Sequence, residues 1–202
     1  MPDTEQLPLL ILCGGQSSRM GSPKALLPVN GGTLLDYLAA NAVPSRPLWL
    51  ADDGSGLPAP ARAVRLPDAL LDKQGPLSAV LSALQQARRQ GLTGVYVMTC
   101  DTLIAPEAMI GRLNAAGAPD CDTVLMLRSP ATAYPLLAYW PGALSDGLAA
   151  YLESGSRRVM RWVAQIQARD TAMPDAWQPY ANFNTPAEFS AALAAWQAQQ
   201  AA

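Results

Sequence analysis

Residues 9–24 read LLILCGGQSSRMGSPK, and the rest of the chain can be interpreted outward from this stretch. A mainly apolar run, residues 7–13, leads into a loop rich in glycine and serine, which contains Arg19 and Lys24 but no acidic residue. Open α/β sheets bind ligands where strands end and loops begin. Backbone N–H groups, serine hydroxyls and two cations together suit a polyphosphate. The stretch therefore predicts a buried first strand followed by a phosphate-binding loop.

The loop differs from two common phosphate-binding loops. A dinucleotide fingerprint needs G-x-G-x-x-G, and a Walker A loop needs Gly-Lys followed by Ser or Thr. Here Pro23 precedes Lys24 and Ala25 follows it. The pattern resembles instead the G-G-x-S-x-R-M-G-x-x-K loop of the nucleotidyltransferases, and among them it is most similar to the molybdenum cofactor guanylyltransferase family. For the Gly14-Gly15 pair alone, an ordinary surface turn is the alternative.

Length and charge limit the classes of function. The chain has 202 residues, which fits one domain, so we expect a single nucleotidyltransferase domain over residues 1–202. No apolar run approaches the roughly 18 residues of a membrane span, and the N-terminus is acidic, so we expect a cytoplasmic protein with no membrane partner. The formal net charge of −2 lacks the excess of positive charge typical of nucleic-acid-binding proteins, so no nucleic-acid partner is expected.

The chain contains no histidine. This absence excludes Ser-His-Asp and Cys-His catalysis and every His-ligated metal site, and it leaves carboxylates, Lys, Arg and a hard cation for the chemistry. The three cysteines, Cys13, Cys100 and Cys121, fit neither a disulfide framework nor a zinc site, because they are odd in number and widely spaced. We expect them to be small buried residues in a reducing compartment.

Apolar segments of strand and helix type alternate along the chain. Strands are expected at 7–13, 47–51, 64–66, 95–98, 123–127 and 134–139. Helices are expected at 34–43, 76–89, 106–116, 144–152 and 159–166, with a last one from 186 that begins with a capping box of Thr185 and Glu188. The spacing predicts an α/β, three-layer Rossmann-like fold of nucleotidyltransferase type, with a mostly parallel sheet. The last two strands are too close for a crossover helix, so we expect them to pair antiparallel.

Asp101 directly follows the strand at 95–98, at the same edge of the sheet as the glycine-rich loop. A carboxylate there can hold Mg²⁺ against phosphate oxygens, since Mg²⁺ takes one or two carboxylates and completes its shell with water and phosphate. A turn or helix-capping role for Asp101 is the alternative. The segment around it, Thr99-Cys100-Asp101-Thr102, resembles the metal-binding C-D-T element of the family, although Leu103 stands where the family has Pro.

Two weaker patterns resemble the family's substrate contacts. Asp68 and Gly75 lie in a D…G-P-L pattern, which implies contacts to the base or ribose of the nucleotide; an exposed loop aspartate and an ordinary helix start are the alternative, and Asp72 competes for the role. Asn182 and Asn184 lie in an N-x-N-T-P element, which implies contacts to the pterin; Asn184 alternatively shapes the helix start.

Arg157 lies in a segment that resembles a second pterin contact, with a solvated arginine pair as the alternative. The chain also departs from the family at two points. Tyr134 occupies the place of a family His, and Asp52 stands in the region of a family Asn.

The resemblance implies transfer of GMP from GTP to the terminal phosphate of molybdopterin, with or without molybdenum, and release of pyrophosphate. It implies that Arg19 binds the β and γ phosphates, Lys24 the α-phosphate and Asp101 the Mg²⁺. The nucleotide would also contact four successive residues, Leu12, Cys13, Gly14 and Gly15. Related cytidylyltransferases carry Ala at the position of Gly14, which favours GTP here.

Three alternatives to this activity stay open. Cytidylyl transfer to the same pterin and nucleotidyl transfer to a sugar phosphate belong to the same class of reaction. A nucleotide-binding protein that delivers the cofactor without turnover belongs to another. The expected partners are GTP and the molybdopterin or molybdenum cofactor, and molybdoenzyme-maturation proteins are further candidate partners.

Overall fold

A computed structural model describes the fold for residues 7–14, 20–51, 54, 56–69, 75–117, 119 and 121–201. Its main sheet has seven strands, which in spatial order are β5 (Ala63–Arg65), β4 (Leu48–Ala51), β1 (Leu9–Leu12), β6 (Gly94–Thr99), β8 (Ala133–Pro141), β7 (Val124–Arg128) and β9 (Ala168–Ala172). Strand β8 runs antiparallel to β6 and β7, and the other neighbouring pairs are parallel. A separate hairpin joins β2 (Pro28–Val29) to β3 (Gly32–Thr33).

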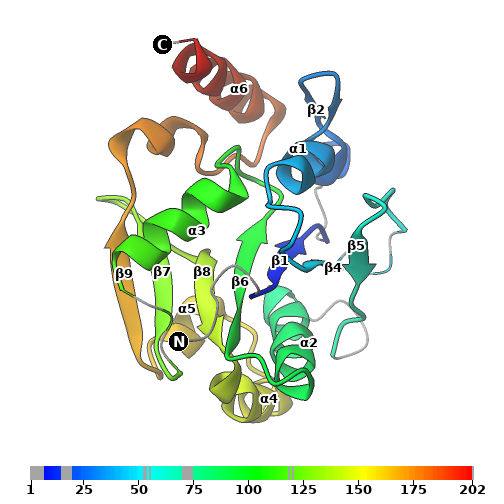
Figure 1. The fold of residues 1–202 in the computed structure, drawn as a ribbon. Coiled ribbons are helices and arrows are strands. Elements are labelled where there is room, and N and C mark those ends of the chain that lie inside the picture. Colours follow the sequence, from blue (N-terminus) through cyan, green and yellow to red (C-terminus); the bar gives the residue numbers. More distant parts are fainter. Residues whose placement is uncertain are drawn as a thin grey trace.

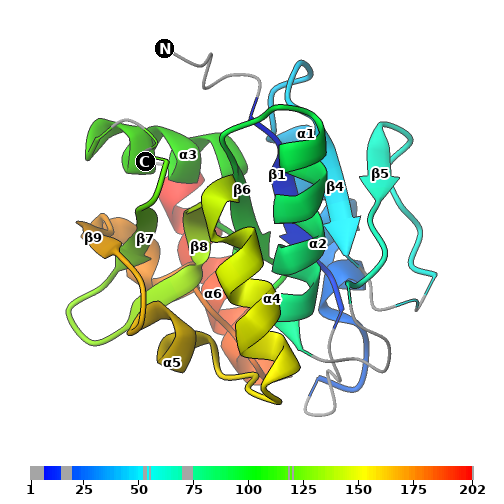
Figure 2. The ribbon, with the colours of Figure 1, turned by 90° about the horizontal axis from the view of Figure 1, so that it is seen from below.

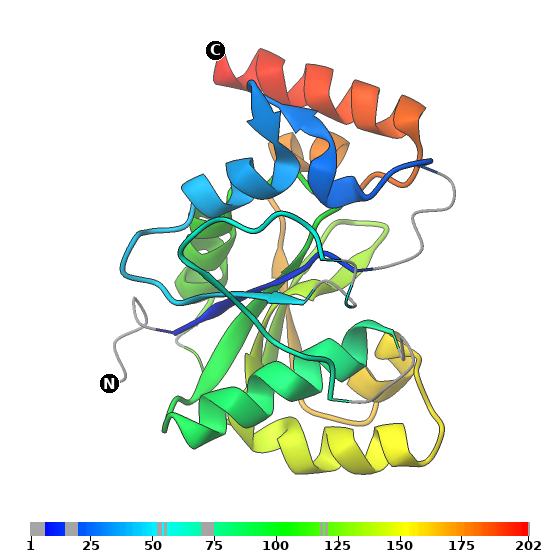
Figure 3. The same cartoon turned by 90° about the vertical axis from the view of Figure 1, so that its right-hand side faces the viewer.

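Helices cover both faces of this sheet (Figures 1 and 3). One face packs against α1 (Leu34–Ala40), α3 (Pro106–Ala115) and α6 (Pro186–Gln200), and the other packs against α2 (Pro76–Arg89), α4 (Ser145–Glu153) and α5 (Val159–Val163). Three short 3₁₀ turns complete the described elements: η1 (Lys24–Leu26), η2 (Gly142–Leu144) and η3 (Asp175–Tyr180). The predicted three-layer α/β fold with a mostly parallel sheet is confirmed.

Strand β1 shows why the first apolar run is continuous. Leu9 and Ile11 point into the core under α1, α3 and α6, whereas Leu10 and Leu12 point into the core under α2 and α4. Successive side chains of a strand face opposite sides, so a central strand covered on both faces needs apolar residues at every position. The end of β1 therefore delivers the glycine-rich loop from the middle of the sheet.

Helix α2 begins where the sequence predicts it. Gly75 precedes the helix with φ of 82°, a conformation that L side chains rarely adopt, and Pro76 occupies the first helical position. Leu77 and Val80 are buried against the sheet, and Arg88 and Arg89 lie in the last turn, where cations favour the negative end of the helix dipole.

One edge strand was not predicted, and two predicted helices end early. Strand β9 was not predicted, because four of its five residues are exposed and an edge strand of this kind carries no apolar alternation. The helix expected at 159–166 ends at Val163, since the chain must turn there to enter β9. The helix expected at 34–43 ends at Ala40, and Val43 instead donates its N–H to Glu107 Oε1 at 3.1 Å.

Within the described part of the chain, no helix combines the length and the apolar character that crossing a membrane requires.

Candidate active site

Lys24 is the centre of a polar site that joins distant parts of the chain. Its Nζ donates hydrogen bonds to the Phe183 carbonyl oxygen at 2.8 Å and to Asn184 Oδ1 at 2.9 Å. Nζ also lies 3.5 Å from Asp101 Oδ2, and the two side chains are 17% and 26% exposed. The site therefore combines an oriented cation with a carboxylate, and both remain partly accessible to solvent.

The position of Asp101 follows from the sheet. Strands β1 and β6 are parallel neighbours, so their carboxyl ends reach the same edge, and Asp101 comes just after β6. Thr99 Oγ1 donates a short hydrogen bond to Asp101 Oδ1, while Lys24 approaches the other oxygen. Both carboxylate oxygens thus have a partner. Sequence reasoning assigned no role to Thr99, the last residue of β6.

The segment from Tyr180 to Asn184 is tied to the chain that follows β6. Phe183 donates its N–H to the Asp101 carbonyl oxygen at 3.0 Å, and Leu103 donates its N–H to the Tyr180 carbonyl oxygen at 3.0 Å. The Phe183 ring is fully buried and packs 5.1 Å from the ring of Phe189 in α6. These contacts hold the carbonyl group and the amide that bind Lys24.

The expected capping box at the start of α6 is only half formed. Thr185 Oγ1 accepts from the Glu188 N–H at 3.2 Å, as predicted. The Glu188 carboxylate, however, accepts from the N–H of Asn184 at 2.6 Å, one residue before the cap. Glu188 therefore fixes the backbone of Asn184, whose side chain meets Lys24. Sequence reasoning missed this role of Glu188 and the role of the Phe183 carbonyl group.

The exit of β1 lies beside the same edge. The N–H groups of Cys13 and Gly14 both donate to the Ala51 carbonyl oxygen, at 2.7 and 3.1 Å, and Gly14 is exposed. Cys13 Sγ lies 3.1 Å from Cys100 Sγ, and both side chains are buried. The hydrogen bond with Cys13, followed by burial, raises the pKa of the Cys100 thiol well above its ordinary value. The expectation of burial is wrong for Cys121, which is exposed.

Gly15, which was predicted to contact the nucleotide, and Arg19, which was predicted to bind its β and γ phosphates, lie outside the described residues, as do Asp52 and Asp72.

A second group of predicted contacts lies around the start of α2 and the end of α4. The N-terminal end of α2 and the segment joining α4 to α5 lie on one side of the molecule (Figures 2 and 3). An added Cβ at Gly75 would meet no atom within 4 Å, so glycine is favoured there by its backbone conformation alone. Asp68 is half-buried in the loop before α2. The Arg157 Nη1 donates to the carbonyl oxygens of Leu152 and Ser156, at 2.5 and 2.7 Å, and so caps the end of α4.

Comparison with known proteins identifies the family of this chain. A family model described as the MobA-like NTP transferase domain matches residues 9–170. The chain belongs to this family. A molybdenum cofactor guanylyltransferase from Acidiphilium cryptum (strain JF-5) is 33% identical over 203 residues, which cover 96% of this chain and 97% of the relative. The resemblance inferred from the glycine-rich loop is therefore confirmed.

Solved structures support the fold of this MobA-like NTP transferase. Molybdopterin-guanine dinucleotide biosynthesis protein A from Archaeoglobus fulgidus superposes with a TM-score of 0.70 at 18% identity, covering 95% of this chain and 100% of that one. A Mycobacterium tuberculosis H37Rv protein in complex with manganese superposes with a TM-score of 0.58 at 17% identity, covering 94% and 98%. At these identities the likeness shows the fold alone.

The donor set of this family member fits a hard divalent cation shared with a phosphate. Across the described residues there is no group of three or more His, Cys, Asp and Glu side chains that could enclose a metal. Asp101 instead offers one oriented, partly exposed carboxylate. Mg²⁺ commonly binds through one or two carboxylates and takes its remaining ligands from water and substrate phosphates, so a single carboxylate at this edge suffices.

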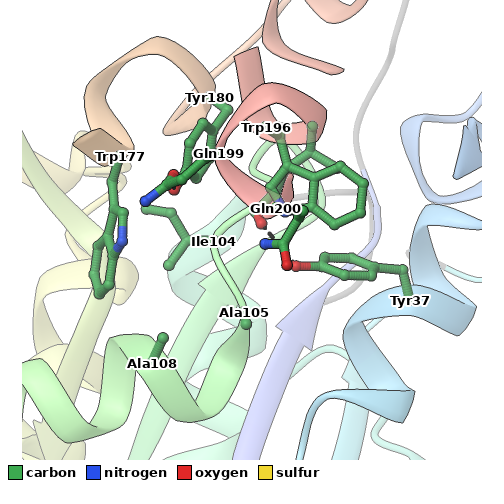
Figure 4. Close-up of a pocket in the computed structure, with 10 residues that line it drawn as sticks. Tyr37, Ile104, Ala105, Ala108, Trp177, Tyr180, Trp196, Gln199 and Gln200 are labelled. Carbon is green, nitrogen blue, oxygen red and sulfur yellow. Dashed lines mark hydrogen bonds between the residues drawn. The ribbon is translucent and has the colours of Figure 1, made fainter. Parts of the chain in front are cut away.

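A cavity of about 200 Å³ lies at the C-terminal end of α6, where Trp196, Gln199 and Gln200 line it (Figure 4). Figure 4 shows Tyr37 and Trp196 on one side of it and Trp177 on the other. Tyr37 donates its hydroxyl to the Leu103 carbonyl oxygen at 3.0 Å, and burial raises the pKa of Tyr37 to about 12. The cavity lining includes neither Lys24 nor Asp101, and its aromatic side chains anchor α6 rather than form the site.

Proposed function

We propose that the chain transfers GMP from GTP to the terminal phosphate of molybdopterin, with or without bound molybdenum, and releases pyrophosphate. The observation that carries this proposal is Lys24, an ammonium group held beside Asp101 by a backbone carbonyl group and the Asn184 amide. The guanylyltransferase relatives that match this chain along nearly their whole length support it.

The proposed chemistry needs no strong general base. The attacking group is already a phosphate anion, which agrees with a chain that has no histidine. Catalysis then depends on positioning and on neutralising charge at the α-phosphate. An ammonium group has three N–H donors. Two N–H donors of Lys24 point to the Phe183 carbonyl oxygen and Asn184 Oδ1, and the third is available to Asp101 or to a phosphate oxygen.

Asp101 is the proposed ligand of Mg²⁺, which when bound supplies positive charge to the phosphates of GTP. Thr99 would keep the carboxylate in one orientation for this purpose, since it donates to Oδ1. The manganese complex of the Mycobacterium tuberculosis protein supports a divalent cation in this fold, although it identifies no ligand in this chain.

The remaining predicted contacts are part of the proposal. Asn184 has its oxygen engaged by Lys24, which leaves the amide N–H groups for the pterin. The further residues proposed to bind the nucleotide are Leu12, Cys13, Gly14, Gly15, Arg19, Asp68 and Gly75. Those proposed to bind the pterin with Asn184 are Asn182 and Arg157. We further propose that residues 1–202 act as one domain in the cytoplasm, with molybdoenzyme-maturation proteins as further partners.

Pyrophosphate release in the presence of GTP, Mg²⁺ and molybdopterin tests the activity. Lys24→Ala should reduce turnover by at least about a hundredfold, the effect of losing one preorganised charge at a developing oxyanion, while GTP binding weakens less. Steady-state rates within a few-fold of wild type, on a folded variant, would remove Lys24 from the mechanism.

Nucleotide and acceptor controls separate the rival functions. A larger melting shift with CTP than with GTP would favour cytidylyl transfer. Pyrophosphate release with a sugar phosphate but not with molybdopterin would favour the sugar nucleotidyltransferases. A GTP-dependent melting shift with no pyrophosphate release from either acceptor would favour a non-catalytic delivery protein.

A further inference from the structure

Cys13 and Cys100, here called the thiol pair, lie side by side at the ends of two neighbouring strands. Leu12 of β1 is the register partner of Thr99 of β6, so the next residues on the two strands, Cys13 and Cys100, continue this register. The Cys100 N–H donates to the Leu12 carbonyl oxygen at 3.1 Å, which holds the strands together at this point. The two sulfur atoms are 3.1 Å apart.

The backbone separation suits a disulfide bond. Neighbouring strands lie roughly 4.8 Å apart, and the Cα atoms of disulfide-bonded cysteines are usually about 4.4–6.8 Å apart. Both side chains belong to the core cluster under α1 and α3, so they point to the same face of the sheet. A sulfur–sulfur bond is about 2.05 Å long, so the two atoms must approach by about 1 Å from their present separation of 3.1 Å.

We propose that Cys13 and Cys100 form a reversible disulfide bond under oxidising conditions and that this bond weakens nucleotide binding. The bond itself depends only on the geometry of the pair. Its effect on GTP rests on the function proposed above. The thiol pair is thus a modification site, and its reagent is a small disulfide such as oxidised glutathione.

The reaction is a two-step thiol–disulfide exchange. Cys13, the more exposed of the two at 8% against 4%, attacks the reagent disulfide, forms a mixed disulfide and displaces one thiolate. Cys100 then attacks the Cys13 sulfur and displaces the second thiolate. The two cysteines lose two electrons and two protons, and the reagent is reduced to two thiols that take up those protons.

The effect on the site follows from the residues that come directly after the two cysteines. Gly14 follows Cys13, and Asp101 follows Cys100. The two cysteine side chains lie in the core cluster with Met20 and Ala25, where close packing limits their reorientation. The strand ends must therefore absorb part of the 1 Å approach. A misplacement of about 1 Å at a preorganised site can cost on the order of a hundredfold in function.

The test uses the whole protein with Cys121 replaced, because Cys121 is exposed and would react independently. Cys121→Ser protein is equilibrated with oxidised glutathione, and its intact mass and non-reduced peptides are measured. We expect the intact mass to fall by the mass of two hydrogen atoms. The non-reduced digest should contain a disulfide-linked peptide pair with Cys13 and Cys100. Glutathione adducts without the linked pair would overturn the proposed bond, and so would unchanged thiols.

GTP affinity then tests the consequence. The oxidised Cys121→Ser protein should bind Mg·GTP at least about tenfold more weakly than the reduced protein, with full recovery after dithiothreitol. Cys13→Ala in the same background is the matched control, because it removes the attacking thiol, and its GTP affinity should be the same before and after oxidation. A mapped disulfide with unchanged GTP affinity would overturn the switch. Failure of the reduced protein to bind GTP at all would instead contradict the proposed function, and the mass measurement would still decide whether the bond forms.

Discussion

Asn184→Ala isolates the role of the amide that holds Lys24. In wild type, Lys24 Nζ is fixed by the Phe183 carbonyl group at 2.8 Å and by Asn184 Oδ1 at 2.9 Å. A hydrogen bond to a charged group contributes about 1.5–3 kcal/mol, and about 1.4 kcal/mol corresponds to a tenfold change in rate. The Phe183 contact remains in the variant, and the Lys24 side chain is 17% exposed, so water partly replaces the lost partner. We therefore expect kcat to fall by about 10- to 30-fold.

The assay is steady-state pyrophosphate release, measured for wild type, both single variants and the Asn184→Ala, Lys24→Ala double variant. If Asn184 affects turnover through Lys24, its removal should change kcat, measured at saturating molybdopterin, by less than about threefold once Lys24 is already alanine. The fold should be retained, because the bond from the Asn184 N–H to Glu188 uses the backbone and survives the substitution.

Asn182→Ala is the matched control from the same segment. Asn182 is exposed, and we propose that it binds the pterin without contacting Lys24. Its substitution should raise the KM for molybdopterin by a similar factor in the wild-type and Lys24→Ala backgrounds. Additive losses for Asn184 and Lys24 would refute the positioning argument and leave Asn184 as a substrate contact only.

Three further predictions test the metal, the base and the stability of the fold. Asp101→Asn should abolish most activity with the fold retained, because an amide contributes no negative charge to Mg²⁺. Added Mg²⁺ should restore the activity only partly. The same midpoint in Mg²⁺ titrations of both proteins would place the metal elsewhere. Gly14→Ala should lower kcat/KM for GTP more than for CTP, since a residue without Cβ allows closer approach of the purine. An unchanged ratio of the kcat/KM values for GTP and CTP would contradict the choice of guanylyl transfer, and so would a wild type that prefers CTP. Arg46→Met should lower the free energy of unfolding at neutral pH by about 2–3 kcal/mol, because buried Arg46 makes two bonds to the Glu107 carboxylate, at 2.8 and 3.0 Å. This is less than the roughly 3–5 kcal/mol of a fully buried pair, since the Glu107 side chain is 29% exposed. Burial by itself would raise the pKa of Glu107, but the bonds from Arg46 and the Val43 N–H outweigh it and lower the pKa below the ordinary value of 4.5. The pair therefore stabilises the fold fully above pH 4.5, and this stabilisation is lost as the pH falls through the lowered pKa of Glu107. Denaturant titrations should show the difference in free energy of unfolding between the two proteins shrinking over that pH range. A difference that stays constant would argue that packing alone accounts for it.

Much of the fold is present in local sequence patterns. The unbroken apolar run of β1 implies a strand covered on both faces, and the Gly75-Pro76 start with an apolar stripe implies α2. The short gap between β7 and β8 implies their antiparallel pairing, which the structure has. Such patterns are readable because strand and helix periods, caps and turn residues act over a few positions. Strand β9 lacks them, since its polar residues gain their place only by pairing with β7.

The candidate site divides in the same way. Lys24 and Asp101 could be selected from the sequence, because the residues around each of them reveal its role: Lys24 ends a glycine-rich loop, and Asp101 follows the end of a strand. Their mutual contact, and the bond between Lys24 and Asn184 across 160 positions, depend on strand order and on the docking of the segment before α6. The Cys13 and Cys100 thiols, 87 positions apart, meet for the same reason, because β1 and β6 are parallel neighbours in register. Residue type and spacing thus determined which groups could act, and only tertiary packing decided which of them touch.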